Sequence, residues 1–148
     1  MRFHLIDRID DCEPGRSVRA RKLTSRGETY WRGPAGAERM PEPLVLEALC
    51  QAGTWLVLIT TDRRRRAALL SVDAVRFAAP VTPGDVLVME AEVVTMSDES
   101  AVISGRVTVD GATVLEADNV MCALIEADRL EDLDATERMQ AMLTGTAA

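Results

Sequence analysis

The chain has 148 residues, of which 47% are hydrophobic, so it is long enough for one compact core and too short for two comfortable domains. Its formal net charge of −7 at pH 7 argues against a protein that binds nucleic acid through a positive surface. Cys12, Cys50 and Cys122 show no disulfide or metal-ligand spacing, so we expect reduced thiols, no metal site and no cofactor.

The chain begins with two predicted strands, residues 3–9 and 17–23. They are joined by a turn at residues 12–15, because Pro14-Gly15 is a strong turn signal. No charged and apolar leader precedes the first strand, so we expect a cytoplasmic protein. Residues 27–39 hold several glycines and Pro34, which predicts an irregular segment.

Residues 43–59 predict a helix in which Glu47 is the only charged side chain. Pro43 suits the first helical position, and a helix that is apolar on every side is a buried helix. The stretch is too short and too polar to be interpreted as a membrane span. Gln51 shares a helical face with Glu47. Either Gln51 or a backbone amide satisfies Glu47, or the fold holds this carboxylate beside a cavity for acid–base chemistry.

The second half of the chain is rich in Val, Ile, Leu and Thr with strand-like alternation. Strands are predicted at residues 67–77, 86–96, 100–109 and 113–126, and Asp110-Gly111 suits a two-residue hairpin turn. One buried helix and five or six antiparallel strands give an α+β fold in which the sheet curls around the helix.

The last segment carries leucines and methionines among acids. We therefore divide the chain into one domain at residues 1–127 and a short amphipathic helix with a frayed tail at residues 128–148. The sequence leaves open whether this helix lies on its own core or on a partner subunit.

Three motifs, in this order, resemble the hotdog-fold 3-hydroxyacyl-(acyl carrier protein) dehydratases of the FabZ type. F-H-L-I-D-R-I followed by E-P-G is similar to that family's opening strand and turn. M-P-x-x-L-V-L-E-A-L-x-Q-A-G is similar to its helix motif, and V-R-F-x-x-P-V-x-P-G-D followed by V-x-V-D-G to its later strands. The resemblance spans residues 3–126 and implies a hotdog fold, an antiparallel sheet wrapped around one central helix.

The resemblance also implies a dimer with two acyl pockets, each formed by a histidine of one subunit and the helix glutamate of the other. Glu47 matches that glutamate. The family's histidine motif is G-H-F-P-G, but residues 31–36 read W-R-G-P-A-G. Gly33 stands at the histidine position without a gap and Pro34 with a one-residue gap, and neither can transfer a proton. The only histidine, His4, matches an apolar position of the first strand, so we expect a structural or surface role.

Two further departures concern substrate and carrier contacts. Glu42 replaces the glycine whose N–H holds the thioester carbonyl in the family. Glu42 either keeps a weakened oxyanion contact through its own N–H or serves as a favourable charge at the helix N-terminus. The family's basic pair is lost in Phe77-Ala78-Ala79-Pro80. The block Arg63-Arg64-Arg65-Arg66 is either a solvated loop or a docking patch for an acidic partner such as an acyl carrier protein.

These observations give Glu47 as the candidate catalytic residue, and Gly33, Pro34, Glu42 and Gln51 as candidate substrate-binding residues. The expected partners are an acyl thioester on acyl carrier protein or CoA and a second subunit, either an identical chain or a histidine-bearing hotdog paralogue. No nucleic acid or membrane partner is expected. Three functions remain open: a dehydratase homologue that is inactive alone or needs that paralogue, a thioesterase using Glu47, and a non-catalytic binding or scaffold protein.

Overall fold

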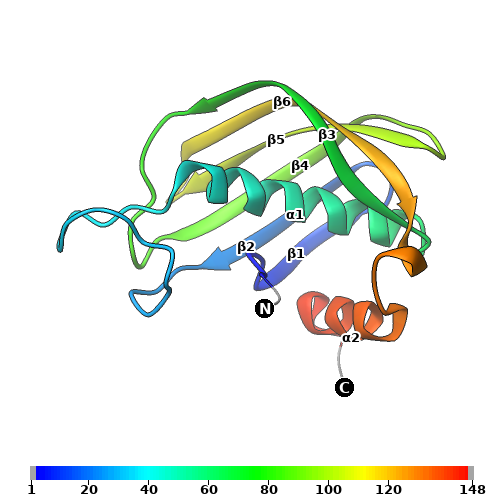
Figure 1. The fold of residues 1–148 in the computed structure, drawn as a ribbon, viewed down its shortest axis with the longest axis horizontal. Helices are drawn as coiled ribbons and strands as arrows, with labels where there is room; N and C mark the ends of the chain where they lie inside the picture. The colour runs from blue at the N-terminus through cyan, green and yellow to red at the C-terminus, as the bar shows by residue number, and fades with distance from the viewer. Residues whose placement is uncertain (1–2, 147–148) are drawn as a thin grey trace.

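Six antiparallel strands form one curved sheet, and helix α1 lies across its concave face in the computed structural model, which describes residues 3–146 (Figure 1). The strands pair in the order β1-β2-β4-β5-β6-β3, so β1 and β3 are the edges. The predicted α+β fold is confirmed, with a strand number in the predicted range. The strands are β1 Arg8–Glu13, β2 Ser17–Leu23, β3 Arg65–Phe77, β4 Val86–Met96, β5 Ser100–Val109 and β6 Ala112–Glu126.

Helix α1, Glu42–Thr60, approaches the sheet through small side chains. Ala48 and Ala52 are fully buried, and Gly53 lies against Ile103 of β5. On the sheet side, Gly105 of β5 leaves no room for a side chain, because a Cβ there would lie 2.5 Å from the carbonyl oxygen of Glu90. Small residues on both elements therefore let the helix seat closely on the strands.

The helix differs from its prediction in two ways. It begins at Glu42 and has 19 residues, so by length and composition it is apolar enough to cross a membrane, contrary to our estimate. The core helix of a soluble protein meets the same criterion, and here the sheet curls around α1. It is also not buried on every side, because Glu47, Cys50, Gln51 and Thr54 are only half-buried. Their spacing puts them on one helical face.

The first strand was predicted too early in the chain. β1 begins at Arg8 rather than at residue 3, because the backbone of Phe3 and Leu5 bonds to a helix side chain, and the first backbone bond to β2 is made by Asp7. The Gln51 side chain accepts a hydrogen bond from the Leu5 N–H at 2.8 Å and donates one to the Phe3 carbonyl at 3.2 Å. Residues 3–5 therefore pass along α1 before the sheet starts.

The turns follow the glycine signals. The first turn lies at residues 14–16, because the strand continues through Glu13, and Gly15 has φ of 77°. The N–H of Gly15 donates to Thr60 Oγ1 at 2.8 Å, which ties this turn to the end of α1. Asp110 and Gly111 both have positive φ, as a two-residue hairpin turn between β5 and β6 requires.

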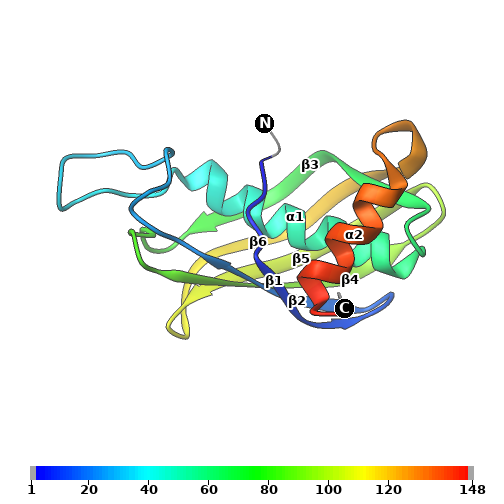
Figure 2. The same ribbon diagram turned by 90° about the horizontal axis from the view of Figure 1, so that it is seen from below.

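A 3₁₀ turn, Ala127–Arg129, and helix α2, Leu133–Thr144, follow the last strand. Asp132 caps the start of α2 by accepting hydrogen bonds from two backbone N–H groups, and Gly145 ends it in the left-handed conformation. α2 packs on its own subunit, close to β1, as the view from below shows (Figure 2). The boundary between a domain at 1–127 and a tail at 128–148 stays a prediction.

Candidate functional site

A cavity of about 720 Å³ lies between one face of α1, the inner face of the sheet and the C-terminal segment. The half-buried face of α1 forms one wall, and β3, β5 and β6 supply apolar side chains opposite it. The segment before β1 and the segment of residues 130–139 close the remaining sides. The cavity is lined by side chains of Phe3, His4, Glu47, Leu49, Cys50, Gln51, Thr54, Trp55, Arg66, Ala67, Leu69, Ile103, Ser104, Val120, Cys122, Leu130, Glu131, Asp132, Ala135, Thr136 and Met139, and by Gly53 and Gly105.

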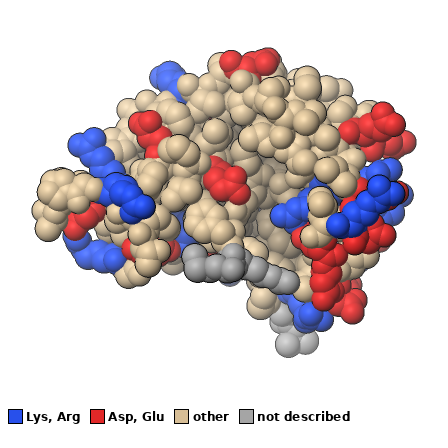
Figure 3. All heavy atoms as spheres, viewed as in Figure 1, with Lys and Arg blue, Asp and Glu red and all other residues tan. Residues whose placement is uncertain are grey.

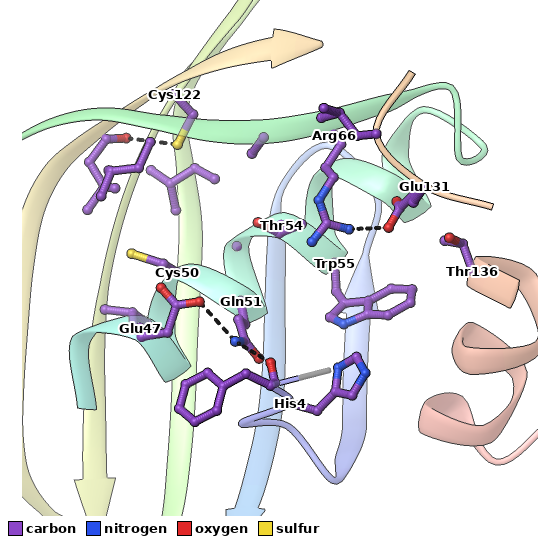
Figure 4. A pocket seen from close by; sticks show the side chains of 18 of the residues that line it. His4, Glu47, Cys50, Gln51, Thr54, Trp55, Arg66, Cys122, Glu131 and Thr136 are labelled. Atoms are coloured by element: carbon purple, nitrogen blue, oxygen red, sulfur yellow. Dashed lines mark hydrogen bonds and ion pairs between the residues drawn. The ribbon is translucent and has the colours of Figure 1, made fainter. Parts of the chain in front are cut away.

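Glu47 lies in this cavity, and Gln51 positions it. The Gln51 Nε2 donates to Glu47 Oε1 at 2.9 Å, and the same amide holds the backbone of Phe3 and Leu5. Figure 4 shows the Glu47 carboxylate beside Cys50, with the Gln51 amide reaching it from one side. A carboxylate has several acceptor sites, so this bond leaves capacity to accept a proton from a ligand.

Two cysteines share the cavity with Glu47. Burial raises the pKa of the Cys50 thiol to about 12, and the Glu47 charge and Cys122 act in the same direction. Burial also raises the pKa of Cys122. Because the thiolate is the nucleophilic form, neither thiol is suited to nucleophilic catalysis near neutral pH. Glu47 is therefore the better candidate for chemistry on this face of α1.

His4 lines the cavity, which we did not expect of a residue with a structural or surface role. The residue is exposed to solvent, and the bonds from Gln51 to the flanking residues fix its backbone. Figure 4 shows the imidazole pointing toward Trp55, with Gln51 between it and Glu47. The cavity thus contains an imidazole and a carboxylate from one chain, but they do not face each other.

The candidate residues of the preceding loop lie elsewhere. Gly33, Pro34 and Glu42 are exposed and do not line this cavity, whereas Glu47 and Gln51 do. Paired backbone bonds of 3.0 and 2.7 Å between Arg32 and Arg39 close the loop at residues 33–38. In a dimer of the kind that the resemblance implies, this loop serves the partner's pocket, so the roles of these three residues stay predictions.

The arginine block contacts the C-terminal segment of its own chain. Arg66 Nη1 lies 2.5 Å from Glu131 Oε2, and Arg63 lies 3.5 Å from Glu137. Acidic and basic side chains interleave over α2 at one end of the molecule, as Figure 3 shows. Neither interpretation of the block anticipated that two of its arginines pair internally.

The sequence pattern anticipated part of this site. Cys50 and Thr54 stand three and seven residues after Glu47, so helical spacing alone would have placed them with Glu47 and Gln51. Met139 and Glu131 carry no such signal. They reach the cavity because the chain after β6 folds back toward it, where Arg63 and Arg66 pair with acids far from them in the sequence.

Comparison with known proteins gives consistent matches along the chain. Residues 1–118 match the FabA-like domain family. The 3-hydroxyacyl-[acyl-carrier-protein] dehydratase FabZ of Roseiflexus castenholzii is 36% identical over 126 residues, covering 84% of this chain and 88% of that protein. The FabZ of Myxococcus xanthus is 35% identical over 139 residues, covering 91% of this chain and 88% of that protein.

A solved structure confirms the fold. The dehydratase heterocomplex ApeI:P of Xenorhabdus doucetiae superimposes with a TM-score of 0.67 at 16% identity, covering 92% of this chain and 89% of that chain. At this identity the likeness concerns the fold, which is the hotdog fold predicted from the motifs.

Proposed function

We propose that this chain, which belongs to the FabA-like family of hotdog proteins, binds the acyl part of a 3-hydroxyacyl thioester and supplies Glu47 to a dehydration site whose imidazole comes from a second subunit. The thioester is carried on acyl carrier protein or CoA. The observation that carries the proposal is the Glu47 carboxylate, held by Gln51 in a cavity that apolar side chains of β3, β5 and β6 line on the side opposite α1.

Elimination of water across C2–C3 needs a base for the C2 proton and an acid for the departing hydroxyl. Glu47 supplies one of these groups, and an imidazole beside it would supply the other at neutral pH. His4 points toward Trp55, and the loop carries Gly33 and Pro34 where the family carries histidine. One chain therefore offers half of an acid–base pair.

A second subunit has a place to bind. The 13-residue strand β3 is a sheet edge, and exposed Leu69 and Leu70 lie on it. Unpaired edges are a liability that oligomers commonly remove. We infer that β3 pairs with another hotdog subunit, and that a histidine-bearing paralogue brings its loop to Glu47. A cytoplasmic location is part of the same proposal.

Co-expression with a histidine-bearing FabZ-type paralogue tests this function. When the paralogue's own helix glutamate is replaced by glutamine, so that its homodimer lacks an acid–base pair, hydration of a 2-enoyl thioester should require both chains. Glu47→Gln in this chain should then lower the rate by about 10²–10⁴ while the complex still assembles. Glu92→Gln is the matched control, because Glu92 is exposed on β4 and does not line the cavity. Equal rates for Glu47→Gln and wild-type complexes would refute the role of Glu47. Hydrolysis of the thioester by this chain alone would favour the thioesterase alternative.

A further inference from the structure

Helix α2 and the segment before it form one end of the acyl cavity. Leu130, Ala135 and Met139 contribute apolar side chains to the lining. All three lie beyond residue 118, where the match to the FabA-like family ends.

Two arginines of the block, Arg63 and Arg66, form ion pairs with the segment that makes this end wall of the cavity. Arg66 Nη1 lies 2.5 Å from Glu131 Oε2, and both side chains are partly buried. Arg63 lies 3.5 Å from Glu137, and its Nη1 donates to Gln140 Oε1 at 3.4 Å. Partly buried ion pairs are less screened than exposed ones, so the Arg66–Glu131 pair contributes more to holding the segment in place than the Arg63 pair, whose Glu137 is exposed.

Few apolar anchors assist them. Leu143 is the one large apolar side chain of α2 that is fully buried, whereas Leu133 and Met142 are exposed. A helix of 12 residues is marginal by itself, so its position depends on its contacts with the rest of the chain. Elements with few buried contacts open at low cost in free energy.

The position of α2 along the cavity indicates what it contacts. Trp55 follows Glu47 by eight residues, which corresponds to about 12 Å along the helix axis. Figure 4 shows Glu47 toward one end of α1, and Trp55 on the side of Arg66, Glu131 and Thr136. An acyl chain whose thioester lies at Glu47 and whose tail runs along α1 meets the wall near Trp55.

We propose that α2 is the end wall of the acyl cavity, that Met139 and Ala135 on it limit the length of the straight acyl chain that fits, and that Arg63 and Arg66 keep the wall in place. The inference rests on the acyl binding proposed above. It adds the substrate class, acyl chains of limited length, and the residues that set the limit.

Acyl-CoA thioesters of increasing even chain length test the wall directly. Their Kd values are measured by fluorescence of Trp55 in a Trp31→Phe background, since Trp55 lines the cavity and Trp31 does not. Met139→Ala should shift the best-bound chain to a greater length, and Ala135→Leu to a shorter one. Each methylene that gains or loses its contacts should change Kd by about fourfold. Met142→Ala is the matched control, because Met142 lies on the exposed side of α2.

Unchanged length preference in both cavity variants, with acyl-CoA binding intact, would overturn this inference and leave the proposed function standing. Failure of the wild-type protein to bind any acyl-CoA or acyl carrier protein thioester would overturn the proposed function and the inference with it.

Amide hydrogen exchange without ligand tests whether Arg66 holds α2 in place. Arg66→Gln should speed exchange across Leu133–Thr144 at least severalfold and leave α1 unchanged. Arg64→Gln should have no such effect, because the Arg64 side chain donates to the Thr61 carbonyl and is exposed. Equal exchange in α2 for both variants would show that Arg66 does not hold the wall.

Discussion

Gly105→Ala should destabilise the protein where β5 approaches both β4 and α1. A Cβ at this position would lie 2.5 Å from the Glu90 carbonyl oxygen, 2.9 Å from Leu49 Cδ1 and 3.2 Å from Ala91 Cα. Two of these atoms belong to the backbone of β4, which cannot move without disturbing the sheet. Overpacking of this kind typically costs about 1–3 kcal/mol. For a chain of this size the loss corresponds to a fall in Tm of about 2–12 °C.

Gly53→Ala is the matched control on the helix side of the same contact. Its Cβ would meet only the Ile103 side chain, at 3.3 and 3.8 Å, and a rotamer change can relieve that approach. Replacing a helix-interior glycine by alanine gains about 0.8–1 kcal/mol in helix propensity. The free energy of unfolding should therefore stay unchanged or rise slightly.

Urea unfolding at neutral pH and thermal unfolding followed by circular dichroism measure both variants. The reasoning would be refuted if Gly105→Ala unfolded at the same denaturant concentration as wild type, or if Gly53→Ala lowered the stability more than Gly105→Ala. In either case the close approach of β5 to β4 and α1 would not limit the stability of the fold.

Three further outcomes are expected. The free energy of unfolding should fall as pH rises from about 9 toward 12, because the folded state keeps the Cys50 proton to a pKa of about 12 while the unfolded chain releases it near 9. Urea titrations across this pH range should show a smaller fall for Cys50→Ala than for wild type. An identical fall in both proteins would exclude Cys50 as the cause. Gly33→His should destabilise the loop, since Gly33 has φ of 111° and a Cβ would lie 2.7 Å from the Ala37 carbonyl oxygen. Pro34→His should fold but give only a weak gain in enoyl-thioester hydration, because placement errors of about 1 Å cost about a hundredfold in rate. Strong rescue of hydration by Gly33→His would contradict this expectation. Analytical ultracentrifugation should show a dimer or dimer-based oligomer at micromolar concentration, and a stable monomer would refute the pairing through β3.

The elements with a clear local sequence pattern were predicted well. The bounds of β2, β4 and β5 agree with the pattern of alternation, and Asp110-Gly111 specifies its own turn. Glu47 and Gln51 share a face because helical spacing fixes it. The helix start at Glu42 lies one residue before the prediction, within the usual uncertainty of helix ends.

The remaining features depend on contacts between distant residues. β1 starts late because Gln51, 46 residues after Leu5, takes hydrogen bonds that a strand would otherwise make. His4 reaches the cavity for the same reason. Arg66 pairs with Glu131 just before α2, 65 residues later in the sequence, and no periodicity indicates that pairing. Local patterns cannot encode such contacts, since they arise only when the chain has folded.

The rate of 2-enoyl-thioester hydration by the purified protein alone tests the central claim most directly. Missing one group of an acid–base pair lowers a rate by about 10²–10⁴, so the wild-type protein should show no turnover above background while it remains folded. Robust hydration by the protein alone would contradict the need for a second subunit's imidazole. If His4→Gln then abolished that activity, the imidazole beside Trp55 would be the group that serves Glu47.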